Sequence, residues 1–293
     1  IFAATTLGME EVRLQGQRND LTAAAYFVAS GEWIETPKHG RQFSYQYIAP
    51  LPKAPLRGVQ NFLARSQFKG LGPVLSEKII NELGEEVIDS LNGNPTRLAD
   101  VSKIDHDKAN AICTQWRGSA LENGLDIFLT DLGLKKNIRA AMSNLPSQDL
   151  LKTIFEDPYA LIEQVSGIGF KIADELALEL GTNHENSDRI LAGLEFTLSD
   201  AAKREGHCGL PTDKLISGAA QLLGNDETLI RSIIDDELSS DFMVMEEFEG
   251  QSFAFLKRLH SCELSILERV KELRTDRSKP NKEKITAALT KLD

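Results

Sequence analysis

A short glycine turn that occurs twice is the feature that most restricts how this chain can fold. Residues 69–78 (KGLGPVLSEK) and 166–175 (SGIGFKIADE) align without gaps. In each, two glycines flank an apolar residue, and a small residue, Ser76 or Ala173, stands four positions past the second glycine. An amphipathic segment follows each turn, so the pattern predicts two helix–turn–helix units of one design.

A third segment has a weaker form of the same pattern. Residues 101–109 (VSKIDHDKA) keep the apolar positions and the small Ala109, but Lys103 and Asp105 replace the two glycines. Two aligned copies and one altered copy predict a tandem helix-hairpin-helix array. We expect the middle copy to be structural, because a Cβ blocks close approach and the Asp105 carboxylate repels phosphate.

Glycine turns of this kind can bind an anion. The amides at the N-terminus of the following helix have no intrahelical acceptor, and the helix dipole favours negative charge there. We therefore expect a phosphodiester to bind these amides beside a lysine, without any reading of the bases. The candidate DNA-binding residues are Lys69, Gly70, Gly72, Gly167, Gly169 and Lys171. The alternative is that the glycines only allow two helices to pack closely.

The glycines do not form a nucleotide-binding motif. Gly167-Ile168-Gly169 lacks the third glycine of a dinucleotide fingerprint, and no strand is predicted before it. No glycine in the chain is followed by lysine, which excludes the Gly-x-x-x-x-Gly-Lys-[Ser/Thr] loop of ATPases. The scattered carboxylates, histidines and cysteines predict no catalytic residues and no metal site.

The chain is predicted to be mainly α with a small N-terminal β module, in four segments. Residues 1–55 form the β module, because aromatic and β-branched residues alternate ahead of a proline-rich connector. Residues 56–206 contain the short helices and glycine turns of the tandem array. Residues 207–260 combine two helices with a hairpin centred on Gly250, which predicts a winged-helix-like segment. Residues 261–293 form a charged helix.

The net charge of −11 is unusual for a nucleic-acid partner, but the charge is unevenly spread. Residues 226–250 contain nine acidic residues and a single basic one, Arg231. This stretch favours a second class of function, a protein-docking scaffold for a basic partner. Three distant cysteines indicate a reducing compartment, so we expect a cytoplasmic protein, and no apolar run predicts a membrane span.

Two tryptophans have different expected roles. Trp33, close to Arg41 in the β module, is a candidate for stacking on bases, so both residues join the candidate DNA-binding set. Trp116 ends a predicted helix, and we expect it to pack in the core. The chain starts without methionine, and we expect the numbering to begin inside a longer protein.

Several segments in the same order together resemble the N-terminal region of RecD-like ATP-dependent DNA helicases. They are GEWIETPKHGRQF (31–43), KGLGPVLSEKII (69–80), EDPYALIEQVSGIGFKIADELALELG (156–181), SDRILAGLEFTL (187–198) and GHCGLP (206–211). Residues 254–273 (AFLKRLHSCELSILERVKEL) resemble the linker ahead of the motor domain. The resemblance therefore spans nearly the whole chain.

The resemblance implies a fold and a role. The family comprises superfamily 1 motors that move 5′ to 3′ on DNA, and its long form has an OB-like β module, here residues 1–55, before the tandem hairpins. It implies a function in DNA repair and recombination, with single-stranded DNA or a single-strand/duplex junction, and other repair proteins, as partners. ATP and Mg²⁺ are expected only for a motor domain, because this chain has no P-loop. We expect a fragment of a larger helicase; the alternative is a stand-alone helix-hairpin-helix protein.

Overall fold

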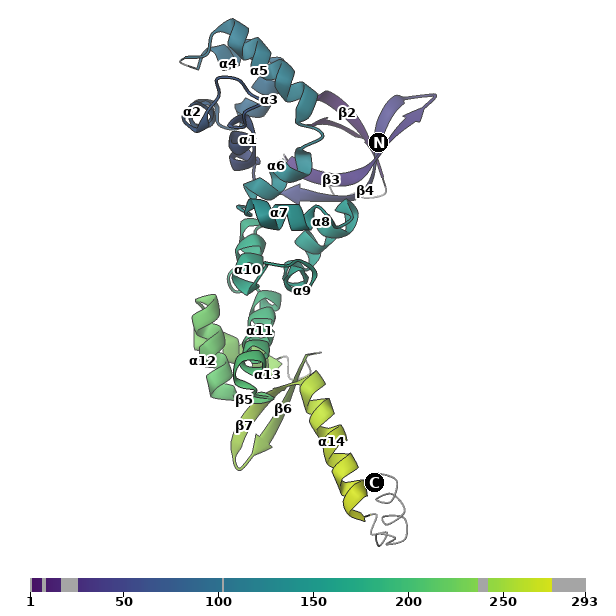
Figure 1. Ribbon diagram of the computed structural model, residues 1–293, viewed down its shortest axis with the longest axis vertical. Coiled ribbons are helices and arrows are strands. Elements are labelled where there is room, and N and C mark those ends of the chain that lie inside the picture. Colours follow the sequence, from purple (N-terminus) through teal and green to yellow (C-terminus); the bar gives the residue numbers. More distant parts are fainter. Residues whose placement is uncertain (1, 7–8, 17–25, 102, 237–241, 276–293) are drawn as a thin grey trace, which may run out of the picture. The chain divides into compact units, whose positions relative to one another are not determined.

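The computed structural model describes residues 2–6, 9–16, 26–101, 103–236 and 242–275 (Figure 1). The chain is mainly α-helical with a small N-terminal β module, as predicted. It divides into two compact units, residues 1–182 and 183–293. The helices in the described part of the chain include none with the length and apolar character that a membrane crossing requires.

The β module of the first unit is a four-stranded sheet with the order β1-β2-β4-β3. Its strands are β1 (Phe2–Thr6), β2 (Met9–Gln15), β3 (Tyr26–Thr36) and β4 (Gly40–Leu51). Strands β3 and β4 pair antiparallel through a tight turn at 37–39. Strands β2 and β4 pair parallel, so the module is not a simple meander.

The rest of the first unit consists of helices. They form two groups, and the buried hydrophobic side chains of each group largely form a cluster of their own. The first group is α1 (Leu56–Leu63), α2 (Pro73–Leu83), α3 (Glu86–Gly93), α4 (Pro95–Ala99) and α5 (His106–Ser119). The second group is α6 (Gly124–Asp131), α7 (Lys136–Met142), α8 (Ser147–Glu156), the short 3₁₀ turn η1 (Pro158–Ala160), α9 (Leu161–Gln164) and α10 (Phe170–Glu179).

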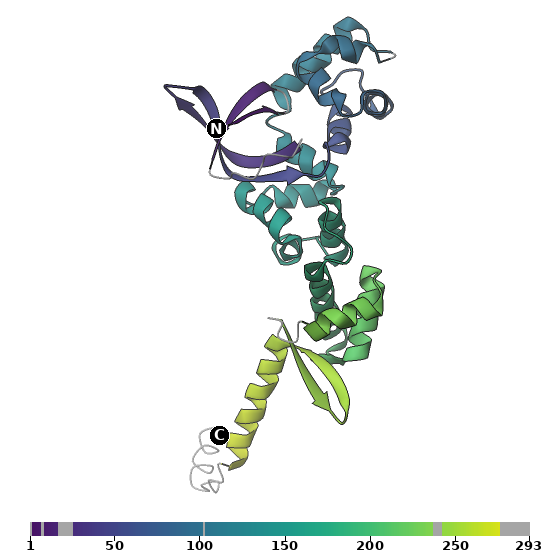
Figure 2. The same cartoon turned by 180° about the vertical axis from the view of Figure 1, so that it is seen from behind.

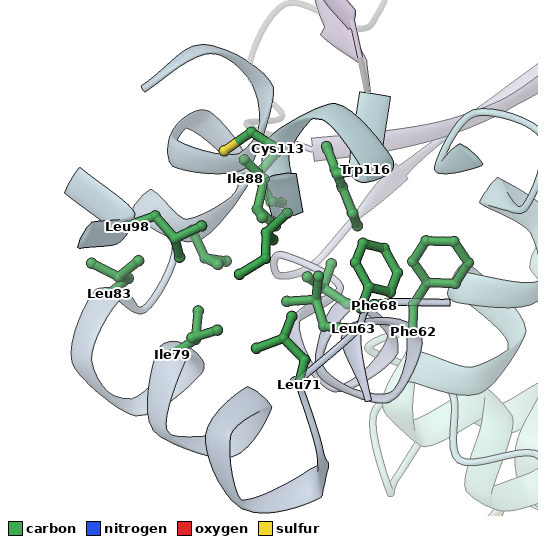
Figure 3. Close-up of a cluster of buried hydrophobic side chains, with 14 of the residues drawn as sticks. Phe62, Leu63, Phe68, Leu71, Ile79, Leu83, Ile88, Leu98, Cys113 and Trp116 are labelled. Carbon is green, nitrogen blue, oxygen red and sulfur yellow. The ribbon is translucent and has the colours of Figure 1, made fainter. Parts of the chain in front are cut away.

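The first cluster includes Trp116, which is fully buried, as predicted from its place at the end of a helix (Figure 3). Its ring packs edge-on against Phe62 at 5.8 Å between centroids. The indole Nε1–H donates to Asn92 Oδ1 at 2.9 Å, so the one polar atom of the side chain is satisfied inside the core. Trp116 is therefore a structural residue.

A glycine sets the distance between the two helix groups. Gly58 of α1 packs directly on α6, and a Cβ at this position would lie 2.1 Å from the carbonyl oxygen of Ile127. Asp131 at the end of α6 closes the contact, because its carboxylate accepts the Gly58 amide at 3.0 Å. Any larger residue than glycine would force α1 and α6 apart.

The second unit contains three strands and four helices among its described residues (Figure 2). In chain order these are α11 (Ser187–Glu205), β5 (Gly209–Pro211), α12 (Thr212–Leu223), α13 (Glu227–Asp236), β6 (Met243–Phe248), β7 (Gln251–Leu256) and α14 (Lys257–Thr275). The sheet order is β5-β7-β6, and both pairings are antiparallel. The turn of the β6–β7 hairpin has positive φ at Glu249 and Gly250, in agreement with the predicted hairpin.

Asn186 caps α11, since its side chain accepts the Arg189 amide at 3.0 Å. Helix α14 begins at Lys257, directly after β7, and so starts earlier than the charged helix predicted over residues 261–293. Residues 276–293, with part of the predicted helical segment, lie outside the described residues.

The division between units falls in a connector, not at the end of the predicted helical array. The four-part division of the chain at 55, 206 and 260 stays a prediction. Helix α1 does begin at Leu56, directly after the proline-rich connector. Helix α11, however, belongs to the second unit, because the compact units meet at Thr182 and Asn183.

Candidate nucleic-acid interface

The three predicted turns share one local hydrogen-bond pattern. In each, the amide of the buried apolar residue donates to the carbonyl three residues earlier, at 3.0–3.2 Å: Leu71 to Phe68, Ile104 to Val101 and Ile168 to Val165. The small residue in the following helix is fully buried in all three copies, as Ser76, Ala109 and Ala173. The repeat seen in the sequence is therefore also a repeat of structure.

The first glycine position has a left-handed backbone in every copy. The φ angle is 76° at Gly70, 93° at Gly167 and 75° at Lys103. Left-handed φ is costly for a residue with a Cβ, and glycine avoids this cost. The middle turn thus keeps the conformation of the other two although it has lost its glycines.

The second glycine position is the N-cap of the following helix. Gly72 caps α2 and Gly169 caps α10, both with extended backbone, and a Cβ on either would have no neighbour within 4 Å. Asp105 caps α5 at the equivalent place, and its carboxylate accepts the Lys108 amide at 2.7 Å. An acidic side chain therefore already occupies the anion position of the middle turn, whereas the outer two turns supply no side chain of their own there.

The two turns with glycine at the cap, before α2 and before α10, differ in how well they can bind an anion. Helix α2 starts with Pro73, which has no N–H, whereas α10 starts with Phe170, which has one. Lys171 lies two positions past the cap of α10, and its side chain is 87% exposed. Its Nζ is 4.0 Å from Oε1 of Glu175, one helical turn further along. The equivalent residue of α2 is Val74, which is exposed and uncharged. The turn before α10 is thus the better anion-binding element.

The structure places the turns in two groups. The first and middle turns are neighbours, because Lys108 Nζ of α5 donates to the Gly70 carbonyl at 3.0 Å. Both lie on the cluster built around Trp116, whereas Val165 and Ile168 of the last turn pack in the second cluster. Lys69 is exposed beside Gly70.

Trp33 and Arg41 form a separate pair on the β module. The Arg41 guanidinium lies 4.3 Å from the centre of the Trp33 ring, and Phe43 contacts that ring edge-on at 5.3 Å between centroids. The half-buried Trp33 ring therefore already has partners within the sheet. Its assignment as a base-stacking residue stays a prediction.

A fourth turn was missed by the sequence analysis. Gly133, between α6 and α7, has φ of 79°, and the next residue, Leu134, is buried. Lys135 then caps α7 with extended backbone. The only signal was the segment LGLKKN (132–137), in which a lysine stands where the pattern required a second glycine.

Two carboxylates in α6 are held by the residues around this fourth turn. Burial raises the pKa of Asp126, but hydrogen bonds from Arg139 and Arg65 outweigh it, so the pKa lies below its usual value. Arg139 Nε donates to Asp126 at 2.7 Å. Burial raises the pKa of Asp131 above its usual value, despite the hydrogen bond from the Gly58 amide and the charge of Arg57. Both acids are thus engaged inside the first unit.

No group of three His, Cys, Asp or Glu side chains that could hold a metal ion occurs within the described ranges.

Comparison with known proteins agrees with this architecture. Residues 119–209 match the family described as the ATP-dependent RecD2 DNA helicase HHH domain, and this range contains the Gly133 and Gly167 turns. The chain is also 28% identical over 185 residues to the ATP-dependent RecD2 DNA helicase of Deinococcus radiodurans. That match covers 61% of this chain and 26% of the relative, so the chain corresponds to about a quarter of that protein. Residues 119–209 are therefore similar to the helix-hairpin-helix domain of RecD2 helicases, and the chain is similar to the N-terminal region of RecD-like DNA helicases.

Proposed function

We propose that the chain binds the DNA backbone without sequence specificity through its open glycine turns. The observation that supports this most is the N-terminus of α10, where Gly169 places no side chain at the cap, the space around it is open, and Lys171 is exposed two positions further on. Amides at a helix N-terminus and an adjacent ammonium group bind a phosphate oxygen well. Neither group distinguishes one base from another. Lys69, Gly70 and Gly72 would form a second, weaker contact of the same kind.

The wider role follows from the similarity to RecD2 helicases. We propose that these residues are a DNA-binding accessory region of an ATP-dependent 5′ to 3′ helicase of DNA repair and recombination, in the cytoplasm. ATP and Mg²⁺ would bind a motor domain elsewhere in the longer protein, since no P-loop is present here. The N-terminal sheet would be OB-like, and the order of helices and strands in the second unit supports a winged-helix-like module.

The structure allows the turn to be tested by a single substitution. A side chain at Gly167 would be strained by its positive φ, whereas Gly169 has ordinary extended backbone and open space around it. We therefore expect Gly169→Val to fold normally but to obstruct the approach of a phosphate. DNA affinity, measured by fluorescence anisotropy at about 50 mM salt, should fall about tenfold, since the contact is largely electrostatic.

A matched control is Gly118→Val, which adds the same side chain at another glycine with free space around it. This variant should bind DNA as the parent protein does. Equal affinities for parent, Gly169→Val and Gly118→Val, with all three folded by circular dichroism, would show that the turn does not contact DNA.

A protein-docking scaffold is the second candidate function. The exposed residues of α13 include Glu227 and Asp235, and its Arg231 is paired with Asp213 at 2.8 Å. The tip of the β6–β7 hairpin adds Glu247 and other exposed acids. Such a surface repels phosphate and suits a basic protein partner. Binding to a basic partner protein, without any DNA binding at low salt, would favour this function over the first.

A further inference from the structure

A cavity of about 730 Å³ lies between the N-terminal sheet and the helices of the first unit. Its walls are mainly apolar, with Phe27 and Trp33 on the side of the sheet, Leu125 and Phe128 from α6 and Leu151 from α8. Cavities of this volume with apolar and aromatic walls are typical of ligand-binding sites. The described residues that line it include none from the four turns, so the cavity is separate from the candidate DNA interface.

The cavity runs along an edge strand of the sheet. Strand β3 pairs only with β4 among the described strands, so one side of its main chain has no strand beside it. All six residues from Tyr26 to Gly31 line the cavity. Because successive side chains of a strand point to opposite faces, a cavity lined by six residues in succession must reach the main chain at the strand edge. The N–H and C=O groups of such an edge can pair with another extended chain.

The side chains of β3 show which groups of an added chain would enter the cavity. Tyr26 and Val28 pack toward the helix clusters, whereas Phe27 and Ala29 pack in a separate cluster within the sheet. A chain paired with β3 would alternate in the same way, and every second side chain would point into the cavity beside α6 and α8. The cavity therefore suits a segment in which apolar and polar residues alternate.

Ser30 supplies a hydrogen-bonding group on the cavity wall. Its side chain is only 7% exposed, and its Oγ has no hydrogen-bond partner within the described part of the chain. Buried hydroxyl groups are nearly always hydrogen-bonded, because an unpaired polar atom away from water is unfavourable. A polar atom of a bound chain could satisfy this hydroxyl.

The charged side chains that line the cavity are both acidic. Glu85 and Asp89 are exposed at its mouth, and the Tyr26 hydroxyl donates to Glu85 at 3.0 Å. This places both the carboxylates and the first residue of β3 at one end of the cavity. A basic residue of a bound chain would complement that end.

The cations near the cavity do not neutralise its acidic end. Lys53 and Lys152 adjoin lining residues in the sequence, and each pairs with a glutamate, at 2.8 Å and 4.0 Å respectively. The Arg41 guanidinium lies 4.3 Å from the centre of the Trp33 ring. Trp33 is seven residues beyond Tyr26, about 23 Å along an extended strand.

We propose that the edge of β3 from Tyr26 to Gly31 binds an extended basic segment of a partner protein by strand addition. The segment pairs with the main chain of β3, places alternate apolar side chains in the cavity, and sets a lysine or arginine against Glu85 and Asp89. Six residues span about 20 Å in a strand, so a segment of about this length is sufficient. The site depends neither on the proposed DNA contacts nor on the acidic surface of the second unit.

The test measures the binding of labelled synthetic peptides of about seven residues to the whole chain by fluorescence anisotropy. In these peptides threonine alternates with valine, leucine or phenylalanine between two terminal lysines. At least one of them should bind, and should bind about tenfold or more tightly than its counterpart with terminal glutamates, because opposite charges meet at the mouth. The same peptide with every internal amide N-methylated should bind about tenfold or more weakly, since it cannot donate to the strand edge.

Gly124→Phe blocks the cavity from the side of α6. Gly124 lies on the cavity wall, and a Cβ there would have no neighbour within 4 Å, so the new ring can enter the cavity without displacing other atoms. Peptide affinity should fall about tenfold or more, while DNA affinity stays within about twofold of the parent. The matched control is Gly118→Phe, at a glycine with free space that does not line the cavity, and it should bind peptide as the parent does.

A second pair of variants tests the acidic end of the cavity. Glu85→Gln/Asp89→Asn should weaken binding of the lysine peptide about fivefold and remove its advantage over the glutamate peptide. Glu77→Gln/Glu82→Gln removes two exposed charges of α2, outside the described lining, and should leave that advantage unchanged.

Three outcomes would overturn the proposal. The first is a folded parent that binds none of the lysine peptides. The second is an N-methylated peptide that binds as well as the unmodified one, since the cavity would then take apolar groups without strand addition. The third is a stable dimer in solution that excludes every peptide, which would assign the edge to a second copy of the chain. DNA affinity is measured in parallel, so failure of this proposal and failure of the proposed DNA function are distinguishable.

Discussion

Single residues in the turns differ in how strongly their backbone demands glycine. Gly167, with φ of 93°, occupies a region that L-residues adopt only at a cost. Lys103 adopts the same left-handed conformation in the middle turn, with φ of 75°. Its neighbour Asp105 offsets part of the cost, because a capping carboxylate stabilises a helix by about 1 kcal/mol. The same fold of the turn is thus reached by two different sets of residues.

This comparison gives a prediction for stability. Gly167→Ala should lower the free energy of unfolding by about 1–2 kcal/mol, because it adds a Cβ to a left-handed residue. Lys103→Gly should be neutral or stabilising by up to about 1 kcal/mol, since strain is removed while the unfolded chain gains entropy. Urea unfolding measures both. Lys103→Ala keeps the Cβ and serves as control; if it stabilised as much as Lys103→Gly, backbone strain would not be the cause.

At the scale of elements, the contact between α1 and α6 depends on the absence of one side chain. Gly58→Ala should destabilise the first unit by about 3 kcal/mol or more, since a backbone oxygen cannot move away as a side chain can. Gly118→Ala adds the same methyl group at an exposed position of α5 with free space around it, and should stabilise by up to about 1 kcal/mol. Thermal unfolding of the two variants distinguishes close packing from helix propensity. Similar melting temperatures would contradict the packing argument.

The Asp126 ion pairs join α6 to α7 and to the end of α1, and they predict a pH dependence. The pKa of Asp126 is lowered in the folded state, so its contribution to stability is present above the unfolded value near 3.8 and is lost as pH falls through the lowered value. Asp126→Asn should reduce stability at neutral pH and flatten the loss of stability below about pH 4. Asp149→Asn, at an exposed aspartate of α8, should leave that slope unchanged. A parent-like acid slope in Asp126→Asn would contradict the role of this carboxylate.

At the scale of the whole molecule, each unit has interactions of its own that stabilise it. In the second unit, Arg189 is only 2% exposed, and its guanidinium donates to the carbonyls of His184 and Leu223 and to Asn225 Oδ1 at 2.8–3.0 Å. All four turns lie in the first unit.

Disruption of the second unit should therefore leave the proposed DNA interface intact. Arg189→Met removes the donors to Asn225 Oδ1 and to the Leu223 carbonyl, whereas the His184 carbonyl keeps its hydrogen bond from Asn225 Nδ2, and the change should cost about 1–3 kcal/mol. Differential scanning calorimetry should show one transition shifted down and the other unchanged, with unaltered DNA affinity. A single transition that shifts as a whole would show that the units unfold together.

The sequence alone was sufficient for the features that depend on neighbouring residues. Glycine spacing identified two of the turns, and apolar periodicity identified the helices after them, because both depend on residues within one or two helical turns. Alternation and the glycine at 250 identified the β6–β7 hairpin for the same reason. The motif order also supported the resemblance to RecD-like helicases, which the family match agrees with.

Only the tertiary structure decided which turns lie together and which groups each turn exposes to a ligand. The fourth turn escaped the pattern because Lys135 replaces a glycine whose position tolerates any side chain, and its left-handed Gly133 is not visible in the spacing. The contact of Lys108 with Gly70 joins residues 38 positions apart, and the contact of Gly167 with Ile138 also joins distant residues. Contacts of this kind are set by how buried side chains fill a shared core, which no local pattern in the chain specifies.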